Sequence, residues 1–124
     1  MVDANPSTSK TKVMVVEDSV IIRMTMVDML EEIGIPCAEA GDGPQALGIL
    51  AIDKDIDVLM TDLGLPGMSG LELAQQALEL RPHLKIIVAS GYSEPAAGSS
   101  GELRQAVYLQ KPFTLAQLRK ALDT

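Results

Sequence analysis

The chain has 124 residues, which allows one domain at about 150 residues per domain. Seventeen acidic residues against ten basic ones give a net charge of -7, and the aromatic residues are two Tyr and one Phe. This charge repels phosphate backbones and anionic lipid headgroups, and few rings are available for bases to stack on, so direct binding to nucleic acid or membranes is not expected. No uncharged run approaches the ~20 residues of a membrane span. The single Cys37 fits a reducing cytoplasm, where we expect the protein to reside.

Residues 1–11 are small and polar, so we expect a disordered tail or linker there and one domain over residues 12–124. Short apolar runs predict strands at 13–16, 58–60 and 86–89, with weaker ones near 36–40 and 106–109. Helical patterns lie between them at 20–33, 44–53, 69–80, 94–104 and 114–123. The fourth of these helices contains glycines and adjacent serines, so we expect it to be short or irregular. Five such β-then-α units predict an α/β fold with a doubly wound, five-stranded parallel sheet and five helices.

The helix predicted at 20–33 carries two apolar stripes. One stripe has helical spacing and is expected to face the core: Ile22, Met26, Met29 and Ile33. The second consists of Val20, Ile21, Met24 and Val27. Because a helix on the outside of a sheet buries one stripe, we expect the second to be exposed and to form a docking surface for a partner.

Polar side chains follow four of the predicted strands. Glu17 and Asp18 follow the first strand, Asp62 the third, Ser90 the fourth and Lys111 the fifth. Parallel strands bring their carboxyl ends to one edge of a sheet, so these groups should converge on one cleft. Three adjacent carboxylates repel one another unless a cation lies among them, and a donor set made only of oxygens favours Mg²⁺. Lys111 and Ser90 suit phosphoryl oxygens, which leaves one carboxylate free to form an aspartyl phosphate.

Each of these residues, taken alone, also has a structural interpretation. Asp18 could favour the start of a helix, and Asp62 could cap a turn. Ser90 could belong to a turn with Gly91, and Lys111 could be a solvated surface lysine. Their occurrence together at four strand ends favours a functional site.

Four segments carry a family resemblance: Glu17-Asp18, Asp62 to Gly70, Ala89 to Tyr92, and Tyr108 to Phe113. Together, over residues 12–123, they resemble the receiver domain of two-component response regulators. The resemblance implies a flavodoxin-like sheet with strand order 2-1-3-4-5. It also implies that Asp62 accepts a phosphoryl group from a phosphohistidine on a histidine kinase or histidine phosphotransfer protein.

The resemblance further implies a metal site. Asp18 and Asp62 would bind Mg²⁺ directly, the backbone carbonyl of Gly64 would be a third ligand, and Glu17 would act through water. The domain would then be a signalling domain that catalyses its own phosphorylation and dephosphorylation, and not a metabolic enzyme.

The resemblance also implies a conformational switch that uses Ser90 and Tyr108. Lys111 would pair with the phosphoryl group, Ser90 would move toward it, and Tyr108 would swing inward. The surface around residues 94–104, the fifth strand and the last helix would change as a result. The Lys111-Pro112 bond is expected to be cis.

Three other functions share part of this pattern. A phosphatase using an aspartyl phosphate typically needs a second acid two residues after the nucleophile, where this chain has Gly64. An FMN carrier needs a hydroxyl-rich loop after the first strand, where this chain has Glu17 and Asp18. A degenerate receiver acting only through interactions would not need the complete set of site residues. Phosphorylation could also produce a weak homodimer.

Overall fold

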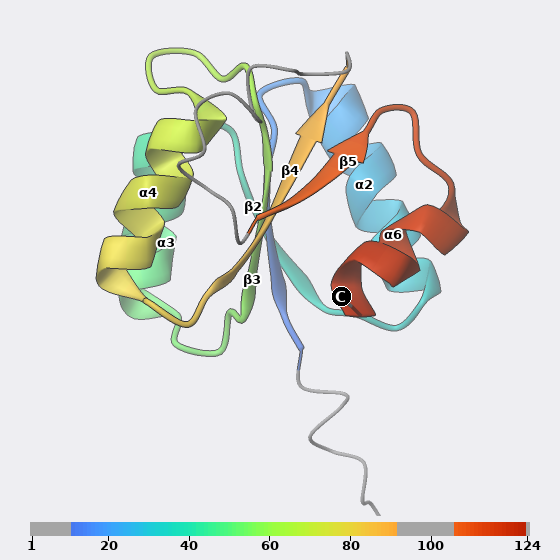
Figure 1. Ribbon diagram of the computed structural model, residues 1–124, viewed down its shortest axis with the longest axis horizontal. Helices are drawn as coiled ribbons and strands as arrows, with labels where there is room; N and C mark the ends of the chain where they lie inside the picture. Colours follow the sequence, from blue (N-terminus) through green and yellow to red (C-terminus); the bar gives the residue numbers. More distant parts are fainter. Residues whose placement is uncertain (1–10, 92–105, 124) are drawn as a thin grey trace, which may run out of the picture.

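The computed structural model describes residues 11–91 and 106–123, which form a sheet with helices on both faces (Figure 1). The strands are β1 (Val13–Val16), β2 (Cys37–Ala40), β3 (Val58–Asp62), β4 (Lys85–Ser90) and β5 (Val107–Gln110). The described residues contain four helices, namely α2 (Val20–Glu32), α3 (Gly43–Ile52), α4 (Gly70–Leu80) and α6 (Leu115–Asp123). The helix expected at 94–104 and residues 1–10 of the expected tail lie outside the described residues.

The sheet has the order β2-β1-β3-β4-β5 with every pair parallel, which confirms the doubly wound, flavodoxin-like architecture. Helices α3 and α4 cover one face, and α2 and α6 cover the other (Figure 1). None of the helices in the described ranges is long and apolar enough to cross a membrane.

Strand β1, which lies between β2 and β3, shows why its sequence forms a strand buried on both faces. All four of its residues are buried, and side chains along a strand point alternately to opposite faces. Met14 and Val16 therefore pack toward α3 and α4, whereas Val13 and Val15 pack toward α2 and α6. The unalternating apolar run is thus explained by two separate hydrophobic cores.

Side-chain caps fix where three helices begin. The Ser19 hydroxyl accepts a hydrogen bond from the Ile22 N–H at the start of α2, and the Asp42 carboxylate accepts one from the Gln45 N–H at the start of α3. At α4, Ser69 and Glu72 form a reciprocal capping box. These caps satisfy amide groups that a helix leaves unpaired, so the loops at the carboxyl edge of the sheet end at defined positions.

Helix α2 is rotated relative to the prediction. Met26, Val27 and Leu30 are its buried residues, whereas Ile22 is 39% exposed. The predictions that Ile22 faces the core and that Val27 is exposed are therefore wrong. The buried stripe continues toward the start of the helix at Arg23, whose side chain is 18% exposed. An arginine does not count as apolar, so this stripe was not visible in the hydrophobic pattern.

Candidate functional site

The acidic residues predicted to converge do so at the carboxyl edge of the sheet. Glu17 and Asp18 lie in the loop from β1 to α2, and Asp62 is the last residue of β3, the neighbouring strand. One carboxylate oxygen from each of the three lies within 4.8 Å of the others. Glu17 is buried, Asp18 is exposed and Asp62 is intermediate, so the cluster extends from the interior to the surface.

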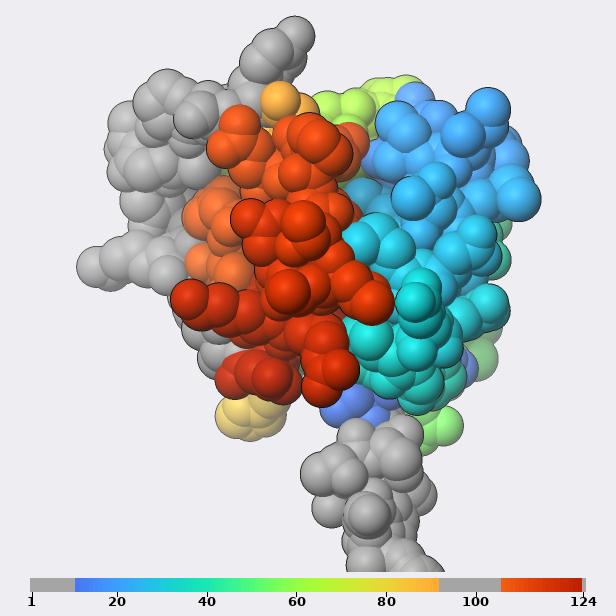
Figure 2. Space-filling model, turned by 90° about the vertical axis from the view of Figure 1, so that its right-hand side faces the viewer, coloured from blue at the N-terminus to red at the C-terminus, as the bar shows by residue number. Residues whose placement is uncertain are grey.

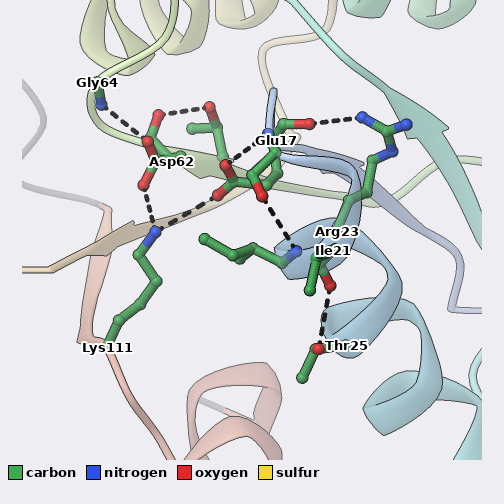
Figure 3. Close-up of polar contacts among 10 residues, drawn as sticks. Glu17, Ile21, Arg23, Thr25, Asp62, Gly64 and Lys111 are labelled. Carbon is green, nitrogen blue, oxygen red and sulfur yellow. Dashed lines mark hydrogen bonds and ion pairs between the residues drawn. The ribbon is translucent and has the colours of Figure 1, made fainter.

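Lys111, which follows β5, reaches across the edge of the sheet into this cluster (Figure 3). Its Nζ donates a hydrogen bond of 2.7 Å to Asp62 Oδ1 and one of 3.4 Å to Glu17 Oε1. Burial alone would lower the pKa of the lysine, but the hydrogen bond and charge of Asp62, together with Glu17, raise its pKa overall. The site therefore contains a fixed positive charge next to Asp62.

The Glu17 carboxylate is held from two sides. It is 3% exposed and accepts a hydrogen bond of 3.1 Å from the Ser19 N–H in addition to the contact with Lys111. Burial raises the pKa of Glu17, the charge of Asp62 acts in the same direction, and Ser19 and Lys111 oppose them. A buried acid beside another acid is costly to ionise, which makes a further cation favourable here.

Asp62 is oriented by the loop that follows it. Its Oδ2 accepts a hydrogen bond of 3.1 Å from the Gly64 N–H, while Oδ1 accepts from Lys111 (Figure 3). The first residue of α4, Gly70, donates its N–H to the Leu63 carbonyl over 2.8 Å. A Cβ on Gly70 would overlap the backbone carbonyl of Asp62, so only glycine lets the helix begin this close to the strand.

Ser90 and Tyr108 occupy the two adjacent strands beside the cluster. Ser90 is the last residue of β4 and is 8% exposed, and its carbonyl accepts the Lys111 N–H over 2.7 Å. Tyr108 is 40% exposed on β5. The Lys111-Pro112 bond is cis, as expected.

Of the four residues predicted to form an exposed docking surface, three are exposed. Val20, Ile21 and Met24 are 57%, 77% and 56% exposed, and we call them the α2 patch. The fourth, Val27, is 9% exposed and packs in the core between α2 and the sheet.

An apolar groove of about 520 Å³ lies between α2 and the segment after β5. Figure 2 looks onto this side of the molecule, where α2 in blue and the orange to red C-terminal segment are both visible. The lining residues are Ile22, Thr25, Met26, Met29, Gly91, Lys111, Pro112 and Phe113. Lys111 therefore connects the groove to the acidic cluster.

The donor set of the cluster fits a hard divalent cation. Three carboxylates lie close together, and among the described residues this is the one group of His, Cys, Asp or Glu side chains with suitable spacing. Oxygen donors of this kind suit Mg²⁺, which commonly keeps several waters and uses one or two carboxylates. The three carboxylates carry three negative charges when ionised, whereas Lys111 carries one positive charge. Lys111 therefore neutralises only part of the charge of the cluster.

Sequence reasoning missed one residue near the site. Arg23 Nη1 donates a hydrogen bond of 2.7 Å to the Glu17 carbonyl, and its Nε donates one of 3.2 Å to Glu39 Oε1. One signal in the sequence could have identified Arg23. It has helical spacing from Met26, Val27 and Leu30, and these three residues form the stripe of α2 that faces the core.

Residues 13–123 match the family model for the response regulator receiver domain. The fold and the acidic site agree with this match, and the chain belongs to the response regulator receiver domain family. It is therefore a signalling domain of two-component systems, in which receiver domains work with histidine kinases or phosphotransfer proteins.

Three comparisons show the range of its relatives. The chain is 41% identical over 105 residues to protein-glutamate methylesterase/protein-glutamine glutaminase 2 of Caulobacter vibrioides, which covers 82% of this chain and 30% of that protein. It is 32% identical over 113 residues to the response regulator receiver protein CpdR of Brucella abortus, covering 90% and 93%. The crystal structure of a response regulator receiver domain protein from Clostridium thermocellum superposes with a TM-score of 0.84 at 26% identity, covering 91% of each chain. Because this chain spans less than a third of the methylesterase, the activity in that name belongs to the longer protein.

Proposed function

We propose that Asp62 is the phosphoacceptor of this receiver domain and that its phosphoryl donor is a phosphohistidine on a histidine kinase or histidine phosphotransfer protein. The observation that carries the proposal is the contact of Lys111 with Asp62 Oδ1 at the edge of a three-carboxylate cluster. This arrangement combines a nucleophile, a cation for the transferred group and a set of metal ligands in one place.

In the proposed reaction, an oxygen of Asp62 attacks the phosphorus in line with the phosphorus–nitrogen bond of the donor. That bond breaks as the new oxygen–phosphorus bond forms, and the imidazole leaves with the bond electrons and takes up a proton. Lys111 is placed to balance charge on a phosphoryl oxygen, and the Gly64 N–H holds the carboxylate during the attack. Hydrolysis of the acyl phosphate by water would return Asp62 to its carboxylate form.

The proposed metal is Mg²⁺, with Asp18 and Asp62 as direct ligands, the Gly64 carbonyl as a third and Glu17 acting through water. When bound, the ion supplies charge stabilisation for the phosphoryl oxygens. The support for this assignment is the distance of at most 4.8 Å among the carboxylate oxygens and the donor set made only of oxygens.

Phosphorylation by acetyl phosphate in the presence of Mg²⁺, followed by mass spectrometry, tests the assignment. Wild type should gain one phosphoryl group, Asp62→Asn should gain none, and addition of EDTA should abolish labelling. The matched control is Asp57→Asn, which changes an exposed carboxylate outside the cluster and should be labelled normally. Labelling of Asp62→Asn at the wild-type level would contradict the proposal.

We propose that the partner docks on the α2 patch and along the neighbouring apolar groove. The patch lies on α2, which begins two residues after Asp18 and also lines one side of the groove. Lys111 belongs both to the groove lining and to the acidic cluster. A helix that carries the phosphohistidine could therefore contact exposed apolar side chains while its imidazole faces Asp62.

Met24→Lys tests this docking surface, because it places a charge in the α2 patch without altering the acidic cluster. Phosphotransfer from the partner should fall at least tenfold, the size of effect expected when a central interface contact is removed at a cost of about 1.4 kcal/mol or more. Labelling by acetyl phosphate should stay normal. Ile52→Lys is the control, since Ile52 is 82% exposed on α3, across the sheet from α2. Equal phosphotransfer by both variants would contradict the proposed docking.

We propose that Ser90 and Tyr108 transmit phosphorylation to the surface. Ser90 ends the strand next to Asp62 in the sheet order, and the exposed Tyr108 lies opposite Val88 on the next strand. The expected change around residues 94–104 falls outside the described residues, so Tyr108 offers the more direct test.

The chain has two Tyr and no Trp, so Tyr92→Phe leaves Tyr108 as the only strong intrinsic fluorophore. Beryllofluoride, a phosphoryl mimic, should protect Tyr108 from quenching by acrylamide in this variant. The same variant combined with Asp62→Asn should show no change. Unaltered quenching when beryllofluoride is bound would contradict an inward movement of the ring.

A further inference from the structure

Arg23 lies where the inward-facing stripe of α2 meets the carboxyl edge of the sheet. Its side chain is 18% exposed, and the next residues along this stripe, Met26, Val27 and Leu30, are all buried. A charged side chain in such a position must find polar partners, because an unpaired buried charge is strongly unfavourable.

The partners of Arg23 are divided between the loop after β1 and strand β2. Nη1 donates to the Glu17 carbonyl over 2.7 Å, and Nε donates to Glu39 Oε1, near the end of β2, over 3.2 Å. The guanidinium also lies beside the turn after β2, where a Cβ on Gly41 would be 3.4 Å from Nη1. Figure 3 shows the Arg23 side chain extending from α2 to Glu17. The side chain thus joins the loop after β1 to the end of β2.

The carbonyl that Arg23 holds is part of the peptide group that links Glu17 to Asp18. Fixing this peptide plane restricts the directions in which both carboxylates can leave the backbone. The Glu17 N–H donates a hydrogen bond of 3.1 Å to the Ala40 carbonyl of β2. Both backbone polar groups of Glu17, the N–H and the carbonyl, are therefore anchored. The contact with Arg23 therefore restrains the peptide group from which two of the three members of the acidic cluster extend.

We infer that Arg23 is a positioning residue that preorganises Glu17 and Asp18 for a divalent cation. This inference rests on the proposed function, since it takes the acidic cluster to be a Mg²⁺ site. Residues that orient metal ligands without touching the metal typically contribute about 10–100-fold to metal affinity.

The planar guanidinium matters as well as the charge. Arginine donates from several nitrogens in a fixed fork, so one side chain can hold a carbonyl and a carboxylate at the same time. Lysine keeps the charge but loses this geometry, so Arg23→Lys should lie between wild type and a neutral variant. Glu39 contributes from a side chain that is 49% exposed, so its removal should matter less than loss of the Glu17 contact.

Calorimetric titration with Mg²⁺ alone tests the inference in four proteins: wild type, Arg23→Met, Arg23→Lys and Glu39→Gln. The dissociation constant should rise about 10-fold or more in Arg23→Met, by less in Arg23→Lys, and by less than about threefold in Glu39→Gln. The rate of labelling by acetyl phosphate should fall in Arg23→Met at limiting Mg²⁺ and return to the wild-type rate at saturating Mg²⁺. Loss of a residue needed only for folding would not weaken Mg²⁺ binding while leaving the labelling rate at saturating Mg²⁺ unchanged.

Two results would overturn the role of Arg23. One is a Mg²⁺ dissociation constant of Arg23→Met within twofold of wild type, and the other is a labelling defect that saturating Mg²⁺ does not restore. If Arg23→Met fails to fold, Arg23→Lys takes its place, and a dissociation constant of Arg23→Lys equal to that of wild type would contradict the inference. Asp18→Asn and Asp62→Asn test the proposed function separately. If wild type binds no Mg²⁺, the proposed metal site and this role both fail, whereas failure confined to the Arg23 variants leaves the proposed function standing.

Discussion

Gly70 and Gly48 show that the same residue type has opposite roles in two helices. At Gly70, a Cβ would overlap the backbone carbonyl of Asp62, so the missing side chain allows α4 to start against the site. At Gly48, inside α3, a Cβ would meet nothing within 4 Å. The first glycine is required by close packing, and the second only adds conformational freedom to the unfolded chain.

Alanine at these two positions should therefore change stability in opposite directions. Gly70→Ala should lower the free energy of unfolding by about 1–3 kcal/mol through overpacking, and it should slow labelling of Asp62. Gly48→Ala should raise the free energy of unfolding by about 0.5–1 kcal/mol and leave labelling unchanged. Urea unfolding and acetyl phosphate labelling measure the two effects. A Gly70→Ala protein as stable as wild type would show that the helix can shift to make room.

A salt bridge at the opposite edge of the sheet gives a prediction about pH. Lys12 Nζ contacts Asp53 Oδ2 at 2.6 Å, and Asp53 Oδ1 accepts the Asp55 N–H. The hydrogen bond from Lys12, together with that N–H, lowers the pKa of Asp53 from its ordinary value of 3.8. A lowered pKa in the folded state means that ionised Asp53 stabilises the fold.

This stabilisation should be complete above the ordinary pKa of Asp53 and disappear as the pH falls through the lowered folded-state pKa. The difference in melting temperature between wild type and Asp53→Asn should therefore be constant near neutral pH and shrink in acid. Thermal unfolding followed by circular dichroism over this range would measure it. A difference that does not change with pH would show that Asp53 acts through packing and not through its charge.

Among the elements, α3 and the loop that follows it are bonded to the end of α4 through one arginine. Arg81, which follows α4, donates hydrogen bonds to the carbonyls of Leu50, Asp53, Lys54 and Ile56. The shortest of these, to Ile56, measures 2.5 Å. Carbonyls at the end of a helix lack partners within it, so the guanidinium satisfies those of Leu50 and Asp53. Its bonds to Lys54 and Ile56 join the loop after α3 to the end of α4.

Arg81→Met keeps much of the side-chain volume and removes these bonds. We expect the free energy of unfolding to fall by about 1.5–3 kcal/mol, the range for hydrogen bonds involving a charged group. Arg119→Met on α6 is the control, because Arg119 is exposed and should change stability by less than about 0.5 kcal/mol. Urea denaturation measures both, and equal stability of the two variants would contradict the bridging role of Arg81.

At the scale of the whole molecule, the proposed Mg²⁺ site would link stability to the cation. The cluster gathers three carboxylates around one lysine in a chain whose net charge is already -7. Repulsion among these groups lowers the stability of the metal-free fold, and a cation that binds only the folded state raises it by mass action.

Mg²⁺ at 100 times its dissociation constant should raise the free energy of unfolding by about 2.7 kcal/mol. Asp18→Ala should abolish this increase, and without Mg²⁺ it should unfold at the same or a higher urea concentration than wild type, because one repulsive charge is gone. Asp28→Ala, at an exposed position on α2, should keep the full response to Mg²⁺. A Mg²⁺ response that persists in Asp18→Ala would place the ion elsewhere.

The strand order followed from the family resemblance. The parallel sheet followed from apolar runs such as Val13–Val16, which do not alternate with polar residues and so suit strands buried on both faces. The convergence of Asp18, Asp62 and Lys111 was predictable because parallel strands bring their carboxyl ends together, whatever the details of packing. These features depend on the pattern of residues in short segments and on the general geometry of parallel sheets.

The orientation of α2 depended on the tertiary structure. Its sequence has apolar residues on several sides, so periodicity indicates a buried stripe without selecting which one faces the sheet. Packing against the sheet buries Val27, exposes Ile22 and turns Arg23 toward Glu17. The sequence alone predicted which charged residues meet at the strand ends. The tertiary structure decided which side chains hold them in place, because those contacts join loops that are distant in sequence and are selected by the packing of the whole fold.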